Sequence, residues 1–376
     1  MHARDLSHAV PLTQQRKVAQ SAPPSVVVKA DDLWEWYRHG KRCEAGVGIV
    51  SRILVIKLGA LGDVVMATPL LDAIARHHAH DQLELLTSPP FAPLFADWPR
   101  YRVTSFARAG WRNNISVLRW LRRSRFDRIY DLQANDRTAL WCALSGSRER
   151  VGNHNRFPYT HHPRDAWRGQ CHIFERLRAV LASAGITDIA DRPLVPCSDA
   201  ARDKVAAWWS AHELGRARVV LIHAGASAGR PEKIWPYFAA LAERLLAQRC
   251  KVVLLGAEPD RIRNAALARL GGIDATSQFS LAELAELGRY AHFAVTNDSG
   301  PMHVLSAAAI PVFGLFGPSD WRRNHALAQA AHVIACVEHD PRFVGQRTGD
   351  CLPALKVELV WSRLLAAGVL GDELGI

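Results

Sequence analysis

Short apolar runs alternate along the chain with longer stretches in which apolar residues recur every three to four positions. The first run, residues 53–56, leads into a turn with two glycines and then into three apolar residues of 70–74 at helical spacing. This order predicts a strand, a loop and a helix. Further strands are predicted at 83–86 and 128–131, with a basic helix over 115–123 between them. Such alternation is typical of a parallel sheet with helices on its faces.

The alternation restarts after residues 191–196, where two prolines disfavour helix and predict a link between domains. The later strands are predicted at 219–223, 251–255, 293–296 and 312–316. The later helices are predicted at 235–248, 259–270, 281–290 and 302–309. The pattern therefore predicts an α/β protein in which two doubly wound, Rossmann-like domains face each other across a cleft. Sheets of this kind bind ligands at the carboxyl ends of their strands.

The first fifty residues do not follow this alternation, because they are mostly polar to Pro24 and then carry a short aromatic cluster at 33–37. We expect a mobile extension with one short helical piece. The predicted organisation is an N-terminal extension over 1–50, an N-terminal domain over 51–190, a linker over 191–198, a C-terminal domain over 199–350, and a C-terminal helix and tail over 351–376.

Composition narrows the class of protein. Of the 376 residues, 49% are hydrophobic and 22% are charged, which excludes a wholly disordered, collagen-like or polytopic membrane protein. The seven cysteines form no CxxC pair and their number is odd, so neither a zinc site nor a disulfide framework is indicated. A reducing cytoplasm is the simplest setting for them. The first 25 residues contain no apolar core of a signal peptide, and the sequence has no run of 18 apolar residues. We therefore expect neither secretion by a signal peptide nor a membrane-spanning helix.

The formal net charge of +11 indicates an acidic partner, which could be nucleic acid, anionic lipid or a phosphorylated small molecule. Nine arginines and one acid lie between Arg100 and Arg128. A charge run is usually a solvated face, but this density favours phosphate or an anionic surface. Interleaved tryptophans keep nucleic acid open as an alternative, although the chain carries no recognisable nucleic-acid-binding motif.

Three loops carry candidate chemistry, and the first is residues 59–63, Gly-Ala-Leu-Gly-Asp, between a strand and a helix. Its two glycines permit a tight turn, and Asp63 stands at the start of the following helix. One interpretation is that Asp63 only caps this helix. The other is that its carboxylate projects into the cleft as a general base.

The second loop, residues 223–236, follows a strand and is rich in small residues that let backbone N–H groups approach an anion. Lys233 stands beside a predicted helix start, a combination suited to a diphosphate. It carries neither a Walker A sequence nor GxGxxG. The alternative is that Lys233 and Arg230 are solvated surface charges.

The third loop, residues 296–303, ends a strand in Asp298, Ser299 and Gly300 before a helix of small residues. Ser299 and Gly300 can offer N–H groups to phosphate, and Asp298 can accept hydrogen bonds from sugar hydroxyls. The alternative for His303 is a histidine packed on the helix. The histidines of 160–166 lack further ligands at typical spacing, so no metal site is predicted there.

These loops in this order resemble glycosyltransferase family 9, the lipopolysaccharide heptosyltransferases. The resemblance spans residues 52–367 and rests on RILVIKLGALGD at 52–63, KIWP at 233–236, TNDSGPMH at 296–303 and FGPS at 316–319. It implies a GT-B fold, with the acceptor on the N-terminal domain and ADP-heptose on the C-terminal domain. It implies no metal and no cofactor beyond the donor substrate, ADP-heptose or a similar nucleotide sugar.

The resemblance also implies an inverting reaction in which Asp63 is the catalytic base. The substrate-binding residues that it implies are Ser227, Lys233, Glu258, Phe279, Asp298, Ser299, Gly300 and His303. Among them Lys233 resembles the family's diphosphate-binding lysine, and Glu258 resembles its ribose-binding residue. Phe279 falls where the backbone of similar enzymes contacts adenine. Only Ser227 can supply a hydroxyl where well-known members have a pair.

The arginine run then becomes a candidate surface for a phosphorylated glycolipid acceptor, through Arg119, Arg122 and Arg123. We expect a cytoplasmic enzyme, peripheral at the inner membrane, with no nucleic acid as partner. Two alternatives stay open. One is a related transferase that uses another nucleotide sugar, and the other is a protein that binds a sugar nucleotide or an anionic polymer without turnover.

Overall fold

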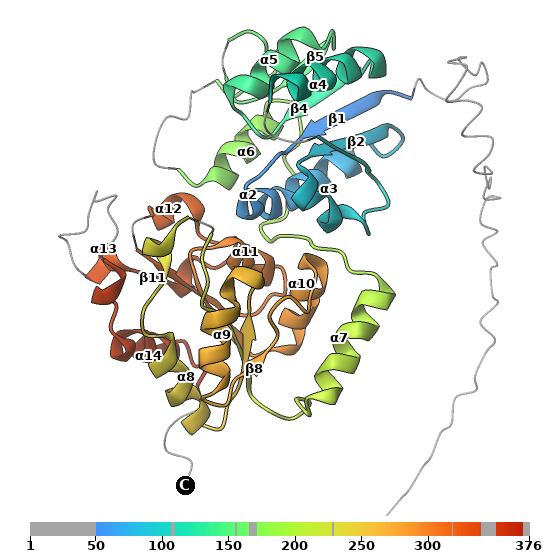
Figure 1. The fold of residues 1–376 in the computed structure, drawn as a ribbon. Coiled ribbons are helices and arrows are strands. Elements are labelled where there is room, and N and C mark those ends of the chain that lie inside the picture. Colours follow the sequence, from blue (N-terminus) through green and yellow to red (C-terminus); the bar gives the residue numbers. More distant parts are fainter. Residues whose placement is uncertain are drawn as a thin grey trace, which may run out of the picture. The chain divides into compact units, whose positions relative to one another are not determined.

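The computed structural model describes residues 50–106, 110–154, 156–164, 171–227, 229–317, 319–339 and 351–370. The helical piece predicted within the first fifty residues lies outside these ranges. Two parallel β-sheets, each covered by helices, form the described part of the chain (Figure 1). This confirms the predicted α/β class with two doubly wound sheets.

The first sheet has the strand order β3-β2-β1-β4-β5, and all its paired strands are parallel. Its strands are β1 (Arg52–Ile56), β2 (Gln82–Thr87), β3 (Arg102–Ser105), β4 (Arg128–Asp131) and β5 (Glu149–Val151). The helices of this half are α2 (Leu61–Met66), α3 (Thr68–His77), α4 (Trp111–Ser124), α5 (Asp136–Leu144) and α6 (Ile173–Ala182), with the 3₁₀ helix η1 (Pro89–Phe95). The central strand β1 is apolar because helices bury both of its faces.

The second sheet has the strand order β11-β10-β9-β6-β7-β8 and is also parallel. Its strands are β6 (Val219–His223), β7 (Lys251–Leu255), β8 (Ile273–Asp274), β9 (Phe293–Asn297), β10 (Val312–Phe316) and β11 (Val333–Ala335). The helices are α7 (Asp199–Ala211), α8 (Phe238–Ala247), α9 (Arg261–Ala268), α10 (Leu281–Tyr290), α11 (Gly300–Ser306), α12 (Trp321–Asn324), α13 (Cys336–His339) and α14 (Val357–Ala366). Short 3₁₀ helices are η2 (Pro231–Lys233), η3 (Glu258–Asp260), η4 (Ala330–His332) and η6 (Leu352–Ala354).

Several predicted helix ends are displaced, each for a local reason. The helix expected from residue 235 begins at Phe238, since Pro236 disfavours helix at the residue before it. The helix expected over 302–309 covers Gly300–Ser306 instead, and the chain beyond it reaches Ala309 with a positive φ of 62°. Residues 191–198 form neither helix nor strand. The domain boundaries themselves stay a prediction.

The two halves of the described chain meet closely at helices α2 and α11. A Cβ atom at Gly62 would lie 2.5 Å from Cδ2 of His303, and a Cβ atom at Gly300 would lie 2.6 Å from Cδ2 of Leu61. Only glycine permits this approach at both positions. The start of α2 is therefore held against the start of α11.

A second contact between the halves joins the segment before α6 to the end of α12. Nε2 of His172 lies 2.9 Å from the backbone carbonyl oxygen of His325, and their ring centroids are 4.3 Å apart. Within the described ranges, none of the helices has both the length and the apolarity needed to cross a bilayer.

Candidate functional site

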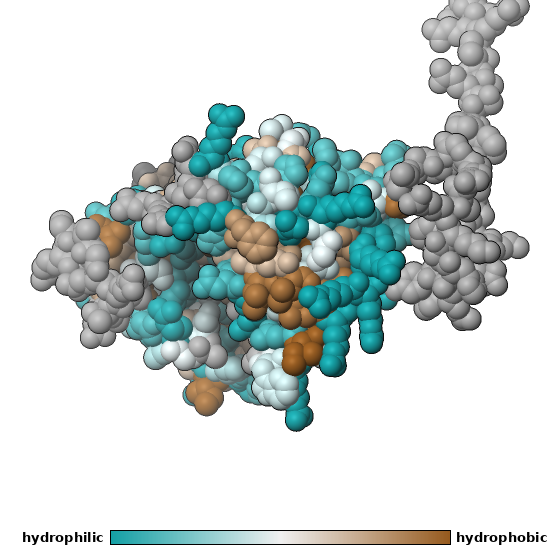
Figure 2. Space-filling model, turned by 90° about the horizontal axis from the view of Figure 1, so that it is seen from above, coloured by the Kyte–Doolittle hydropathy of each residue, from teal (hydrophilic) through white to brown (hydrophobic). Residues whose placement is uncertain are grey.

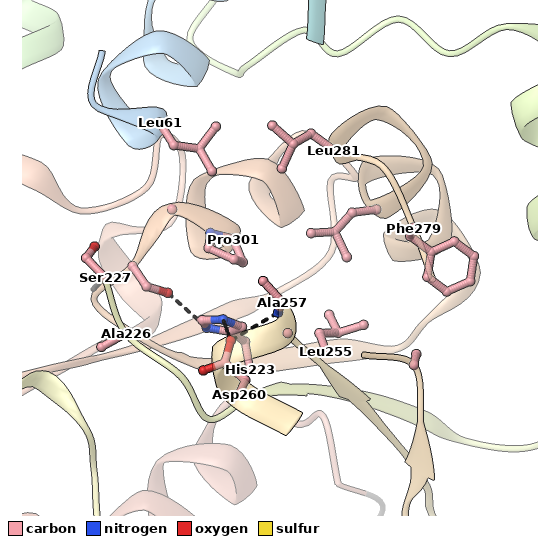
Figure 3. A pocket seen from close by; sticks show the side chains of 15 residues that line it. Leu61, His223, Ala226, Ser227, Leu255, Ala257, Asp260, Phe279, Leu281 and Pro301 are labelled. Carbon is pink, nitrogen blue, oxygen red and sulfur yellow. Dashed lines mark hydrogen bonds and ion pairs between the residues drawn. The ribbon is translucent and has the colours of Figure 1, made fainter. Parts of the chain in front are cut away.

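A cavity of about 320 Å³ lies at the carboxyl ends of β6, β7 and β9, the edge where doubly wound sheets bind ligands (Figure 3). It is lined by Leu61, His223, Ala226, Ser227, Leu255, Gly256, Ala257, Asp260, Ala275, Phe279, Leu281, Leu284, Ser299, Gly300 and Pro301. Aliphatic and aromatic groups form one part of the wall, and a few polar groups form another. This mixture suits a ligand with one apolar ring and one polar end.

One lining residue, Leu61, comes from α2 in the first half of the chain, whereas all the others lie at the end of β6 or after it in sequence. Figure 3 shows Leu61 reaching toward the cavity from above, opposite Pro301 and His223. Asp63 stands two residues further along α2 and is half-buried. Helix α2, which carries Asp63, therefore reaches the same cavity as Ser299 and Gly300 through its first residue, Leu61.

Buried polar groups fix the floor of the cavity. Nδ1 of His223 lies 3.0 Å from Oγ of Ser299, and Nε2 of His223 lies 3.8 Å from Oδ2 of Asp260. Burial alone would raise the pKa of Asp260, but the neighbouring ring of His223 and a hydrogen bond from the N–H of Ala257 hold it below its usual value. A Cβ atom at Gly225 would lie 2.1 Å from Oδ1 of Asp260, so this carboxylate needs a glycine beside it.

The loop after β6 is held by the side chain of Asn297, which is fully buried at the end of β9. Its amide Nδ2 donates to the carbonyl oxygens of Ala224 and Gly225, at 3.0 and 2.9 Å. Its Oδ1 accepts a hydrogen bond from the backbone N–H of Trp235 at 3.0 Å. One side chain thus fixes both ends of the segment that contains Ser227 and Lys233.

Lys233 and Asp298 form an ion pair in which Nζ donates to Oδ2 at 2.6 Å. The exposed fractions of their side chains are 14% and 8%. The structure therefore brings together the lysine and the carboxylate that the sequence assigned to one site, from positions 65 residues apart. Lys233 is not a solvated surface charge.

The carboxylate of Asp63 caps helix α2, because its Oδ2 accepts a hydrogen bond from the backbone N–H of Ala60 at 3.3 Å. The capping interpretation is thus correct as far as it goes. It does not exclude the catalytic one, since a carboxylate has a second oxygen and several further lone pairs. A role of Asp63 as base stays a prediction.

Two residues that the sequence did not single out shape the approach to Asp63. Lys57 follows β1 and is buried, with Nζ donating to the carbonyl oxygen of Leu132 at 3.1 Å. Burial lowers the pKa of Lys57, although the carboxylates of Asp63 and Asp131 oppose this. Gln133 accepts hydrogen bonds from the N–H groups of residues 58 and 59, at 2.9 and 3.2 Å, and so holds the turn before α2.

His303 does not line the cavity; it packs behind it, with its ring against Gly62. Its Nδ1 is buried and has no hydrogen-bond partner within the described part of the chain. Burial lowers the pKa of His303 to about 4, against the opposing effect of Asp298 and Asp63. The neutral ring therefore acts as packing between α2 and α11, as the helix-packing interpretation expected.

The remaining predicted residues divide between the cavity and elsewhere. Ser227 and Phe279 line the cavity, whereas Glu258 is exposed at η3, pairs with Arg261 and is not among the lining residues. Arg119, Arg122 and Arg123 are exposed on α4 in the first half of the chain. Across the described ranges, no three His, Cys, Asp or Glu side chains gather in a way that would hold a metal ion.

Comparison with known proteins identifies relatives of this chain. The model of glycosyltransferase family 9 (heptosyltransferase) matches residues 115–351, more than half of the chain. Lipooligosaccharide heptosyltransferase 2 of Haemophilus influenzae is 32% identical over 146 residues, which are 36% of this chain and 41% of that protein. Lipopolysaccharide heptosyltransferase 2 of Escherichia coli is 25% identical over 312 residues, 76% of this chain and 88% of that protein. The match thus spans about two fifths of the first relative and nearly nine tenths of the second.

Solved structures share the fold. The glycosyltransferase family 9 protein of Veillonella parvula superposes with a TM-score of 0.69 at 24% identity, covering 84% of this chain and 97% of that one. The ADP-heptose lipopolysaccharide heptosyltransferase II of E. coli superposes with a TM-score of 0.67 at 23% identity, covering 85% and 98%. The predicted GT-B fold is confirmed.

Proposed function

The chain belongs to glycosyltransferase family 9, the heptosyltransferase family, and on that premise we propose that it transfers heptose from ADP-heptose to a lipopolysaccharide core acceptor with inversion at the anomeric carbon. The observation that carries this proposal is the contact between α2 and α11. Through this contact Leu61 of α2 lines the same cavity as Ser299 and Gly300, and Asp63 stands two residues after Leu61 on that helix.

The donor occupies the cavity at the second sheet. The apolar wall with Phe279 receives the adenine, and the diphosphate lies at the N–H groups of Ser299 and Gly300. Lys233 neutralises the leaving diphosphate, since its Nζ already lies at the edge of this loop. Asp298 and Ser227 contact sugar and phosphate oxygens. Glu258 contacts the ribose in this proposal, which requires its pairing with Arg261 to open.

The acceptor approaches from the side of α2. Asp63 takes the proton of an acceptor hydroxyl, the oxygen attacks the anomeric carbon, and the bond from that carbon to the ADP oxygen breaks. Attack opposite to the departing ADP inverts the anomeric configuration. Arg119, Arg122 and Arg123 attract the phosphorylated acceptor, and the enzyme works peripherally at the cytoplasmic face of the inner membrane.

A transfer assay with the purified full chain tests the donor. ADP-heptose is compared with UDP- and GDP-sugars on a de-O-acylated core acceptor, and the anomeric configuration of the product is determined by NMR. The proposal predicts transfer from ADP-heptose alone, with inversion. Transfer only from another nucleotide sugar would show that ADP-heptose is not the donor. Binding of ADP-heptose without any transfer would show that the chain is a binding protein and not a transferase.

A further inference from the structure

Helices α4 and α5 carry several large apolar side chains that are exposed to solvent. Of the large apolar side chains that are exposed in the described ranges, four lie on these two helices: Trp111 and Ile115 on α4, and Leu140 and Leu144 on α5. The exposed fraction is 69% for Trp111 and 54% for Leu140. We call these four residues the α4–α5 apolar face.

The spacing of these residues makes each pair continuous. Both pairs are four positions apart, so their members stand one above the other on one side of their helix. The core-facing side of α4 is a different stripe, which contains the buried Val117 and Leu121. The apolar face is therefore not required for packing of α4 against its sheet.

The two helices lie side by side at this face. Nε of Arg122, near the end of α4, donates to the carbonyl oxygen of Leu144 at 2.9 Å. Figure 2 looks onto the end of the molecule where α4 and α5 lie, and it shows brown side chains gathered together with teal ones along their border. Exposed apolar side chains that gather beside basic ones in this way are a feature of interaction sites.

The border of the face is cationic. Helix α4 contains Arg112, Arg119, Arg122 and Arg123 and no acidic residue. Within the described part of the chain, Arg119 and Arg123 make no ion pair, and both are exposed. Asp127, the acid nearest to α4 in sequence, already accepts a hydrogen bond from the backbone N–H of Arg52 at 2.9 Å. The exposed guanidinium groups of Arg119 and Arg123 are thus available to an anionic surface.

We propose that the α4–α5 apolar face docks on an anionic phospholipid bilayer, with its tryptophan and aliphatic side chains in the interface and the arginines of α4 on the lipid phosphates. Tryptophan is suited to the interfacial depth, and arginine stems can bury their methylenes while the guanidinium groups stay at the headgroups. A basic helix with an apolar stripe binds anionic membranes through both contributions. A nucleic acid would use the arginines but has no need of paired aliphatic residues.

This inference deepens the proposed function, because a lipid-borne acceptor is presented at such a surface. Vesicle cosedimentation of the full chain, without substrates, tests it. We expect binding to phosphatidylglycerol–phosphatidylcholine vesicles and much weaker binding to pure phosphatidylcholine. Trp111→Gln with Ile115→Gln should weaken binding at least about tenfold, and so should Leu140→Gln with Leu144→Gln. Glutamine keeps helix propensity, so folding is not the variable.

Matched controls are available in the second half of the chain. Ile262→Gln changes a side chain that is 88% exposed on α9 and should leave vesicle binding unchanged. Charge reversal of Arg119, Arg122 and Arg123 should weaken binding by about 10²-fold or more, because each cation near the surface contributes. Reversal of the exposed Arg216, Arg249 and Arg269, which changes the net charge equally, should weaken it far less.

The failures of the two proposals are distinguishable. The glutamine variants should transfer sugar to a lipid-free acceptor as the unchanged chain does, so a wrong donor shows in that assay and a wrong docking face shows in sedimentation. Docking is overturned if the unchanged chain ignores anionic vesicles, or if the face variants still bind them. It is also overturned if the face variants change only self-association in ultracentrifugation, or only binding to RNA.

Discussion

The substitution Gly62→Ala tests whether the close contact between α2 and α11 determines the geometry of the site. The added Cβ atom would stand 2.5 Å from Cδ2, 2.6 Å from Nε2 and 3.1 Å from Cγ of the His303 ring. Ordinary carbon contacts need about 3.5–4.0 Å, so the helix or the ring must move by about 1 Å. Asp63 is the next residue along α2, and it would move with the helix.

The expected magnitude follows from two opposing effects. Alanine is the better helix former by about 1 kcal/mol, so helix propensity alone predicts that Gly62→Ala is stabilising. Overpacking of a rigid contact costs about 1–3 kcal/mol, and the ring of His303 is fully enclosed. We expect the free energy of unfolding to fall by about 1–2 kcal/mol. A displacement of about 1 Å at Asp63 should reduce kcat by about 10²-fold.

Urea denaturation and initial-rate assays measure both effects, with Gly215→Ala as the control, because a Cβ atom there meets nothing within 4 Å. His303→Ala should relieve the clash, so that the double variant Gly62→Ala, His303→Ala is more stable than the sum of the single effects by about 1 kcal/mol or more. If Gly62→Ala is as stable and active as the unchanged chain, or if the effects of the two substitutions on stability simply add, the contact with His303 does not determine the position of α2.

Three further perturbations address the rest of the site. Asn297→Ala leaves two carbonyl groups and one N–H without partners, so unfolding free energy should fall by about 2–5 kcal/mol and ADP should bind more weakly, as urea titration and calorimetry would show. Lys233→Met removes the cation proposed to bind the diphosphate and leaves the buried Asp298 without its partner. Calorimetry should then show an ADP affinity lower by about 10-fold or more, and Lys233→Arg should restore part of it. The pKa of His303 is about 4 in the folded chain and near 6.5 in the unfolded chain. Between these values the unfolded state binds more protons, so the free energy of unfolding falls as the pH falls through this range, by about 3 kcal/mol in total. Urea titrations at pH 7 and pH 5 should show a smaller loss in His303→Asn, and an equal loss would contradict this assignment.

Much of the fold could be predicted from the sequence because central parallel strands are buried on both faces. The runs at 219–222 and 312–316 carry no polar side chain, and β6 and β10 cover those residues. Short strands at the edge of a sheet have no continuous apolar run that would predict them. Strand β8 has only two residues, Ile273 and Asp274, and neither is fully buried, so its formation depends on pairing with β7.

The site could be predicted only in part. The resemblance to glycosyltransferase family 9 assigned Lys233 and Asp298 to one donor site, and the two form an ion pair at the edge where the parallel strands end. The contact of Gly62 with His303 depends on how the two halves pack, and no local pattern encodes that. Lys57 directly follows an apolar run, a position where a lysine is often exposed. Its burial depends on tertiary packing that the local sequence does not show.

The α4–α5 apolar face shows the same limit on prediction. The arginines were visible as a run in the sequence, but the helical expectation began at residue 115 and so left out Trp111, the first residue of α4. No helix was predicted over residues 136–144, so the exposure of Leu140 and Leu144 on α5 could not be anticipated from the sequence.

We propose that Asp63 is the base of an inverting transfer beside the cavity that Leu61 of α2 and Gly300 of α11 line. The most direct measurement is the rate of heptosyl transfer from ADP-heptose by Asp63→Asn against the unchanged chain, with ADP affinity measured on the same samples. We expect a rate lower by about 10²-fold or more and an ADP affinity that is nearly unchanged. Equal transfer rates would contradict the role of Asp63 as the base.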